Sequence, residues 1–155
     1  MNCGKCNNGF REDSNGKRPC RPCHRDNRRI REYTEELASQ MGLADWTIQI
    51  RFDPTDADTY AEIECVYGQR LARIGVNKNW FTFTRELQRD TLVHELVHAL
   101  IAPLSQMAYD MVDALTDNEG AQAAAKAALA GSEEWVVDPI SIAWAPHMPL
   151  PEERV

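Results

Sequence analysis

The chain has 155 residues and a mass of 17.6 kDa, a length that suits one compact domain with a small appendage. Its hydrophobic fraction of 43% excludes an intrinsically disordered protein. No stretch approaches the roughly 18 apolar residues that a membrane helix needs, and the first residues form no apolar signal segment. We therefore expect a cytoplasmic protein that does not act at a membrane.

The net charge of −7 is distributed unevenly along the chain. Residues 1–31 contain nine basic and three acidic side chains, whereas the remaining residues contain eight basic and 21 acidic ones. A basic head on an acidic body predicts units with different partners. We predict a cysteine-rich module at 1–24, a connecting basic helix at 25–43, a main domain at 44–145 and a proline-rich tail at 146–155.

Four of the five cysteines form two C-x-x-C pairs, Cys3/Cys6 and Cys20/Cys23, separated by 13 residues. Each pair can bind a metal from a tight turn, and two pairs complete a tetrahedral thiolate site. Because such a site has no free position for a substrate, we predict a structural zinc ion that stabilises a segment poor in apolar residues. The alternatives are a redox pair, unpaired thiols, or His24 as a ligand in place of Cys23.

The sequence from Arg25 to Asn77 predicts one helix and three strands. Good helix formers run from about Arg25 to Met41 and end at Gly42, with an apolar stripe of Ile30, Tyr33, Leu37 and Met41. Alternating residues predict a strand at 46–52, and residues 60–67 and 70–77 read as an antiparallel hairpin. Cys65, within this hairpin, is interpreted as a buried apolar residue.

The second half is predicted to be helical. Thr84 can cap a helix that ends near Ile101, since Pro103 lies just beyond. Residues 104–130 are helical by composition with an interruption near 116–120, and Ser132 can begin a last turn. The tail after Pro146 is expected to run over the surface. These elements predict an α+β fold in which a small antiparallel or mixed sheet packs on one central helix.

The segment His94-Glu95-Leu96-Val97-His98 carries the strongest chemical signal. On a helix, His94 and His98 share a face and can bind one metal ion. Glu95 lies between them and can accept a proton from a water that zinc acidifies. The flanking apolar residues predict a buried helix, in which two imidazoles and a carboxylate are costly unless they have partners. We therefore predict a catalytic zinc site.

A catalytic zinc site needs a third protein ligand. Glu134 and Asp138 are four residues apart, so one helical turn could direct Glu134 to the metal while Asp138 holds the far nitrogen of a ligating histidine. Glu133 and His147 are the alternative third ligands. Pro139 directly follows Asp138 and biases it away from helical angles, which opposes this arrangement.

The pattern His94-Glu95-x-x-His98 followed by Glu134-x-x-x-Asp138 resembles that of gluzincin metallopeptidases, and the sheet-then-helix order resembles small zincin-like peptidases, including SprT-like proteins and their phage-encoded relatives. The resemblance covers about residues 44–145. It implies a zincin-like fold and hydrolysis of peptide or protein substrates with Glu95 as general base. It also implies that strand 70–77 is the edge strand that pairs with the substrate. The chain lacks the third histidine that is usual in SprT-like proteins. Tyr109, Tyr67 and His147 remain alternatives for oxyanion stabilisation.

The basic head suggests a different function. Arg21, Arg25, Arg28 and Arg29 could contact nucleic-acid phosphates, although the segment has no interleaved aromatic residues for base stacking. The alternative to a peptidase is therefore a zinc-finger module that binds nucleic acid or protein on a catalytically inert zincin scaffold.

Overall fold

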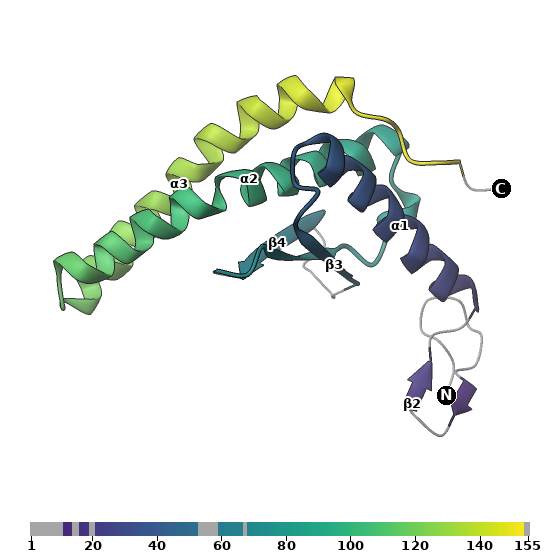
Figure 1. The fold of residues 1–155 in the computed structure, drawn as a ribbon, viewed down its shortest axis with the longest axis horizontal. Helices are drawn as coiled ribbons and strands as arrows, with labels where there is room; N and C mark the ends of the chain where they lie inside the picture. Colours follow the sequence, from purple (N-terminus) through teal and green to yellow (C-terminus); the bar gives the residue numbers. More distant parts are fainter. Residues whose placement is uncertain (1–10, 14–15, 19–20, 53–58, 67, 154–155) are drawn as a thin grey trace.

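The structure, a computed structural model, describes residues 11–13, 16–18, 21–52, 59–66 and 68–153 (Figure 1). Strands β1 (Arg11–Asp13) and β2 (Gly16–Arg18) pair in antiparallel fashion. Cys3, Cys6 and Cys20 lie outside the described residues, and only the backbone of Cys23 is described. The four-cysteine zinc module therefore stays a prediction.

Helix α1 (Arg21–Gln40) joins the core through the predicted stripe, because Ile30, Tyr33, Leu37 and Met41 are all buried. Its end is defined by backbone geometry. Gly42 has φ 82°, a left-handed conformation that glycine adopts without steric cost. The Gly42 and Leu43 amides donate to the carbonyls of Ser39 and Ala38, at 3.3 and 2.8 Å, which is the pattern of a Schellman motif. The predicted helix stop is thus confirmed.

Strands β3 (Thr47–Arg51), β4 (Ala61–Val66) and β5 (Leu71–Val76) form a mixed sheet in the order β3-β5-β4. The hairpin β4–β5 is antiparallel as predicted, whereas β5 pairs with β3 in parallel. The expectation that strand 70–77 is an edge strand is wrong. Parallel pairing with β3 makes β5 the central strand, and Ala72, Ile74 and Val76 are consequently fully buried. The two edges of the sheet are β3 and β4.

Helix α2 (Arg85–Leu115) begins where predicted, since the Thr84 side chain accepts a hydrogen bond from the Leu87 amide. Its first half packs into the core with the sheet and α1 through Leu92, Val93, Leu96 and Val97. The predicted end near Ile101 is wrong, because the helix continues through Pro103 to Leu115. A proline removes one internal hydrogen bond. Packing against the following helix along this length offsets that loss.

Helix α3 (Glu119–Trp144) runs antiparallel beside α2, and α2 lies between α3 and the sheet (Figure 1). Asn118 caps α3 by accepting from the Ala121 amide, after the predicted interruption. The predicted new start at Ser132 is wrong, because its hydroxyl donates to the Ala128 carbonyl inside one unbroken helix. The expectation that Pro139 moves Asp138 out of helical geometry is also wrong. Asp138 and Pro139 both lie within α3, so Glu134 and Asp138, four residues apart, share a face of this helix.

The second half of α2 extends beyond the sheet (Figure 1). Its outer face is apolar and exposed, and consists of Leu104, Met107, Met111 and Leu115. None of the described helices combines the length and apolar content that crossing a membrane requires.

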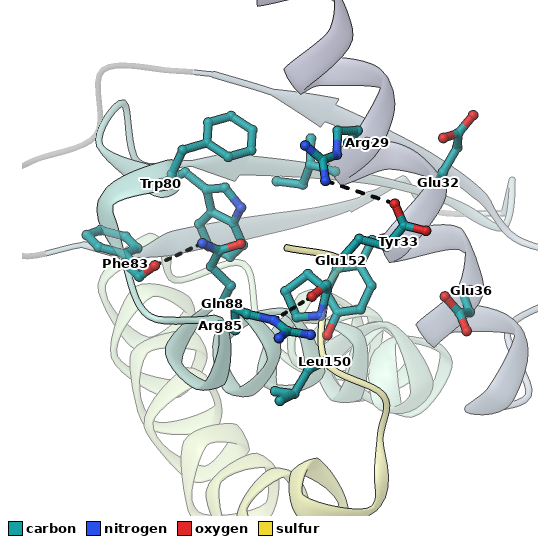
Figure 2. A pocket seen from close by; sticks show the side chains of 13 residues that line it. Arg29, Glu32, Tyr33, Glu36, Trp80, Phe83, Arg85, Gln88, Leu150 and Glu152 are labelled. Atoms are coloured by element: carbon teal, nitrogen blue, oxygen red, sulfur yellow. Dashed lines mark hydrogen bonds and ion pairs between the residues drawn. The ribbon is translucent and has the colours of Figure 1, made fainter. Parts of the chain in front are cut away.

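The C-terminal segment after the short helix η2 (Ala145–His147) does not simply run over the surface, as was expected. Pro151 is buried, and the segment lies between α1 and the start of α2. Tyr33 donates its hydroxyl to the Pro149 carbonyl at 2.7 Å, and Arg85 Nε donates to the Pro151 carbonyl at 2.6 Å. The segment forms one wall of a cavity of about 320 Å³, and Trp80 of η1 (Trp80–Thr82) lines another part of it (Figure 2). These side-chain donors explain why the proline-rich tail is packed.

Candidate metal centre

Two imidazoles on α2 form one side of the candidate centre. His94 and His98 are one helical turn apart, and their ring centroids are 5.0 Å apart with an interplanar angle of 69°. Their side chains are 28% and 16% exposed, so both remain open to solvent on one side. The predicted common orientation of the two histidines is therefore present.

Glu134 approaches both histidines from α3. Its Oε2 lies 3.4 Å from His94 Nε2, and its Oε1 lies 3.2 Å from His98 Nε2. The ligand atoms of the three residues all lie within 4.8 Å of one another. Two ligands that are each about 2.1 Å from a tetrahedral zinc ion are roughly 3.4 Å apart. Two imidazoles and one carboxylate at these separations therefore fit the donor set and dimensions of a zinc site.

Asp138 lies one turn after Glu134 and contacts the opposite nitrogen of one imidazole. Its Oδ1 is 3.4 Å from His94 Nδ1, while His94 Nε2 faces Glu134. A carboxylate at Nδ1 favours the tautomer that leaves Nε2 unprotonated and able to bind a metal. This is the position that the sequence predicted for Asp138.

The alternative third ligands are not part of this cluster. The Glu133 carboxylate lies near Tyr109 and raises the pKa of its hydroxyl, and His147 is exposed in η2. Within the described part of the chain, neither belongs to the group that could hold a metal ion. The geometry therefore favours Glu134 over both alternatives.

Glu95 is buried in α2, with only 6% of the residue exposed. Burial, the largest cause, and the negative charges of Glu134 and Glu62 together raise the pKa of Glu95 from 4.5 to about 8. A carboxylate with a pKa near the working pH can both accept and release a proton. A divalent cation held by the histidines would shift this pKa back down, because it stabilises the ionised form.

His98 is biased towards its neutral form. Burial is the largest cause of its lowered pKa, and it outweighs the opposing effect of the Glu134 carboxylate. Metal binding requires an unprotonated imidazole nitrogen. The environment of His98 therefore favours the form that can act as a ligand.

Edge strand β4 lies close to this centre, which the sequence did not indicate. Burial raises the pKa of the Cys65 thiol on β4 to about 11, and the charges of Glu133 and Glu95 contribute. Glu62 on the same strand contributes to the raised pKa of Glu95. The alternating pattern of β4 indicates which of its residues share a face. That Glu62 and Cys65 lie near Glu95 follows only from the packing of β4 against α2.

The residue that would stabilise an oxyanion stays unassigned. Tyr109 lies near the Glu133 carboxylate, His147 is exposed, and Tyr67 lies outside the described residues. Burial and the Glu133 carboxylate raise the pKa of Tyr109, so its hydroxyl remains protonated.

In comparisons with models of protein families, curated proteins and solved structures, none matches this chain.

Proposed function

We propose that this chain is a zinc-dependent metallopeptidase whose catalytic centre comprises His94, Glu95, His98 and Glu134. The observation that carries the proposal is the arrangement of three donor residues from two helices, at separations that suit one zinc ion, beside a buried carboxylate with a raised pKa. A helix that merely packed in a core would not need two imidazoles and two carboxylates at one place.

The residues divide into ligands and a proton carrier. His94, His98 and Glu134 would hold the zinc ion, and Asp138 would orient His94. When bound, zinc would act as a Lewis acid that polarises the carbonyl group of the substrate and lowers the pKa of a bound water molecule. Glu95 is not among the ligands, so its carboxylate is available to accept a proton from the attacking water and to return it to the leaving amine.

Edge strand β4 offers a place for the substrate. Its outer edge is not paired with another strand of the described sheet. An extended peptide can add to such an edge through backbone hydrogen bonds. Since β4 packs against α2 near Glu95, a peptide bound there would bring a backbone carbonyl towards the centre. We infer that β4, rather than β5, binds the substrate.

The four-cysteine segment would form a second, structural zinc site through Cys3, Cys6, Cys20 and Cys23. A reducing compartment such as the cytoplasm keeps thiols available for metal binding. Metal analysis of the intact chain should give two zinc ions. Cys20→Ser should lose one zinc ion and His98→Ala the other, so that each variant keeps one. A natural chain that holds only one zinc ion, which both variants lose, contradicts the presence of two sites.

The decisive experiment for the catalytic proposal is Glu95→Gln. This variant should keep its zinc content and lose at least roughly 100-fold of the activity on a denatured protein substrate, because the proton carrier is removed. Glu86→Gln, an exposed carboxylate in the first turn of the same helix, is the matched control and should retain activity. Hydrolysis at the unaltered rate by Glu95→Gln rejects the mechanism, and a zinc-loaded natural chain without activity indicates an inert scaffold.

A further inference from the structure

A second surface feature lies between the first half of α1 and edge strand β3. It is an open groove of about 440 Å³. Its walls come from two segments far apart in sequence, and it is lined by Asn27, Arg28, Arg31, Ile48, Gln49, Ile50 and Arg51. We refer to these seven residues as the α1–β3 groove.

The groove is cationic in a protein that is acidic as a whole. Three of its lining side chains are arginines, two are carboxamides and none is acidic, although the chain carries a net charge of −7. Arg28 and Arg31 come from one wall and Arg51 from the other. Guanidinium groups from two walls, together with two carboxamide side chains, match an anion that extends along the groove.

The arginines on α1 also have acidic neighbours. Arg28 Nε lies 3.0 Å from Glu32 Oε1, and Arg31 Nε lies 3.9 Å from Glu35 Oε1. Both are i,i+4 pairs in which all four side chains are more than half exposed. Exposed pairs of this kind contribute little to stability, so the guanidinium groups can turn to a more strongly charged ligand.

Arg29 does not belong to this groove. Its Nη2 donates to the Glu153 carbonyl at 2.7 Å and lies 3.9 Å from the Glu152 carboxylate (Figure 2). The adjacent arginines therefore have different roles: within the predicted nucleic-acid set of Arg21, Arg25, Arg28 and Arg29, Arg28 and Arg29 lie on different faces. Arg29 holds the C-terminal segment, whereas Arg28 lines the groove.

We propose that the α1–β3 groove binds the phosphodiester backbone of a nucleic acid. Arg28, Arg31 and Arg51 would contact phosphate oxygens, and Asn27 and Gln49 would donate further hydrogen bonds. A polyanion satisfies charges on both walls at once, which a single carboxylate does not.

This inference is independent of the peptidase. The groove lies at the β3 edge of the sheet, whereas the candidate metal centre lies near the β4 edge, and β5 separates the two strands. Nucleic-acid binding should therefore be the same in the natural chain and in Glu95→Gln. Failure of either proposal leaves the other intact.

The test uses the intact, zinc-loaded chain and fluorescence anisotropy with labelled 20-nucleotide single-stranded DNA, duplex DNA and single-stranded RNA. Arg28→Ala/Arg51→Ala should weaken binding at least tenfold and should reduce the slope of log K against log salt by about 1 to 2. Lys78→Ala/Lys126→Ala removes the same charge outside the groove and should change affinity less than twofold. The three probes distinguish DNA from RNA as the source of the phosphodiester.

Four results overturn the proposal. They are no binding by the natural chain, equal affinity in the groove variant, equal weakening in the lysine control, and equally tight binding of inorganic polyphosphate.

Hydrogen exchange provides a check that does not depend on variant folding. In the natural chain, nucleic acid should slow exchange at residues 27–31 and 48–51, and protection confined to other segments contradicts the assignment.

Discussion

The Nε2 atom of His98 lies 3.2 Å from Oε1 of Glu134, which links the middle of α2 to the second half of α3. The five-residue motif alone supplies only two donors on one helix. The third donor comes from the antiparallel return of the chain, so the candidate centre depends on the helical hairpin as much as on the motif.

The first prediction concerns which glutamate binds the metal. Zinc at about 100 times its Kd should stabilise the natural chain by about 2.7 kcal/mol. Part of this stabilisation comes from zinc at the candidate metal centre between α2 and α3. Glu134→Ala should remove most of that part, because a ligand is lost, whereas Glu133→Ala should retain it. Thermal unfolding with and without added zinc measures the effect. The opposite ranking of the two variants assigns the site to Glu133.

The second prediction concerns pH and the metal-free protein. The native state keeps the proton of Glu95 up to a pKa of about 8, whereas the unfolded chain releases it near 4.5. The native state therefore binds more protons between these values, and its free energy of unfolding falls as the pH rises. This contribution amounts to about 4 kcal/mol between pH 4.5 and 8.

Glu95→Gln should remove this part of the pH dependence. Urea unfolding in the presence of a chelator, at intervals from pH 5 to 8, gives the difference between the variant and the natural chain. Glu86→Gln controls for the loss of a carboxylate in the same helix. Parallel pH profiles for the natural chain and Glu95→Gln contradict a raised pKa at this residue.

The third prediction concerns Cys65. A thiol with a pKa of about 11 is roughly 0.1% ionised at pH 8, whereas a free cysteine is about one quarter ionised. Alkylation of Cys65 should therefore be on the order of 100-fold slower than that of free cysteine, and Glu133→Gln should accelerate it. Peptide mass spectrometry separates Cys65 from the other cysteines. Labelling at the rate of a free thiol is incompatible with the described environment.

The fourth prediction compares two leucines on different surfaces. Leu37 is 0% exposed in the core, whereas Leu104 is 65% exposed on the outer half of α2. Leu37→Ala should lower the free energy of unfolding by about 2–5 kcal/mol, and Leu104→Ala should change it by less than about 0.5 kcal/mol. Chemical denaturation measures both. A large loss for Leu104→Ala points to a contact that covers this leucine in solution.

Local patterns predicted the first half of the fold well. The stripe from Ile30 to Met41, the Gly42 stop and the β4–β5 hairpin follow from periodicity and turn residues. The parallel pairing of β3 with β5 was not predictable, because it joins segments separated by β4 and depends on how the sheet closes over α2. The edge strand was misassigned for this reason.

Prolines caused two further errors. Pro103 predicted the end of a helix, and Pro139 predicted a non-helical Asp138, but both prolines lie inside long helices. The cost of a lost backbone hydrogen bond is a local quantity, whereas the gain from packing α2 along α3 is a tertiary one that a single sequence does not display. The spacing of Glu134 and Asp138 was nevertheless informative, since one turn of helix was enough to place both beside the histidines.

The hydrogen bonds from Tyr33 on α1 and Arg85 at the start of α2 to the carbonyls of Pro149 and Pro151 tie the C-terminal segment to both helices. Proteolytic trimming of these few residues would thus remove anchors from α1, far away in sequence, and would uncover Tyr33 and the adjoining aromatic side chains. An affinity tag for purification is better separated from this C-terminal segment by a spacer than fused directly to it.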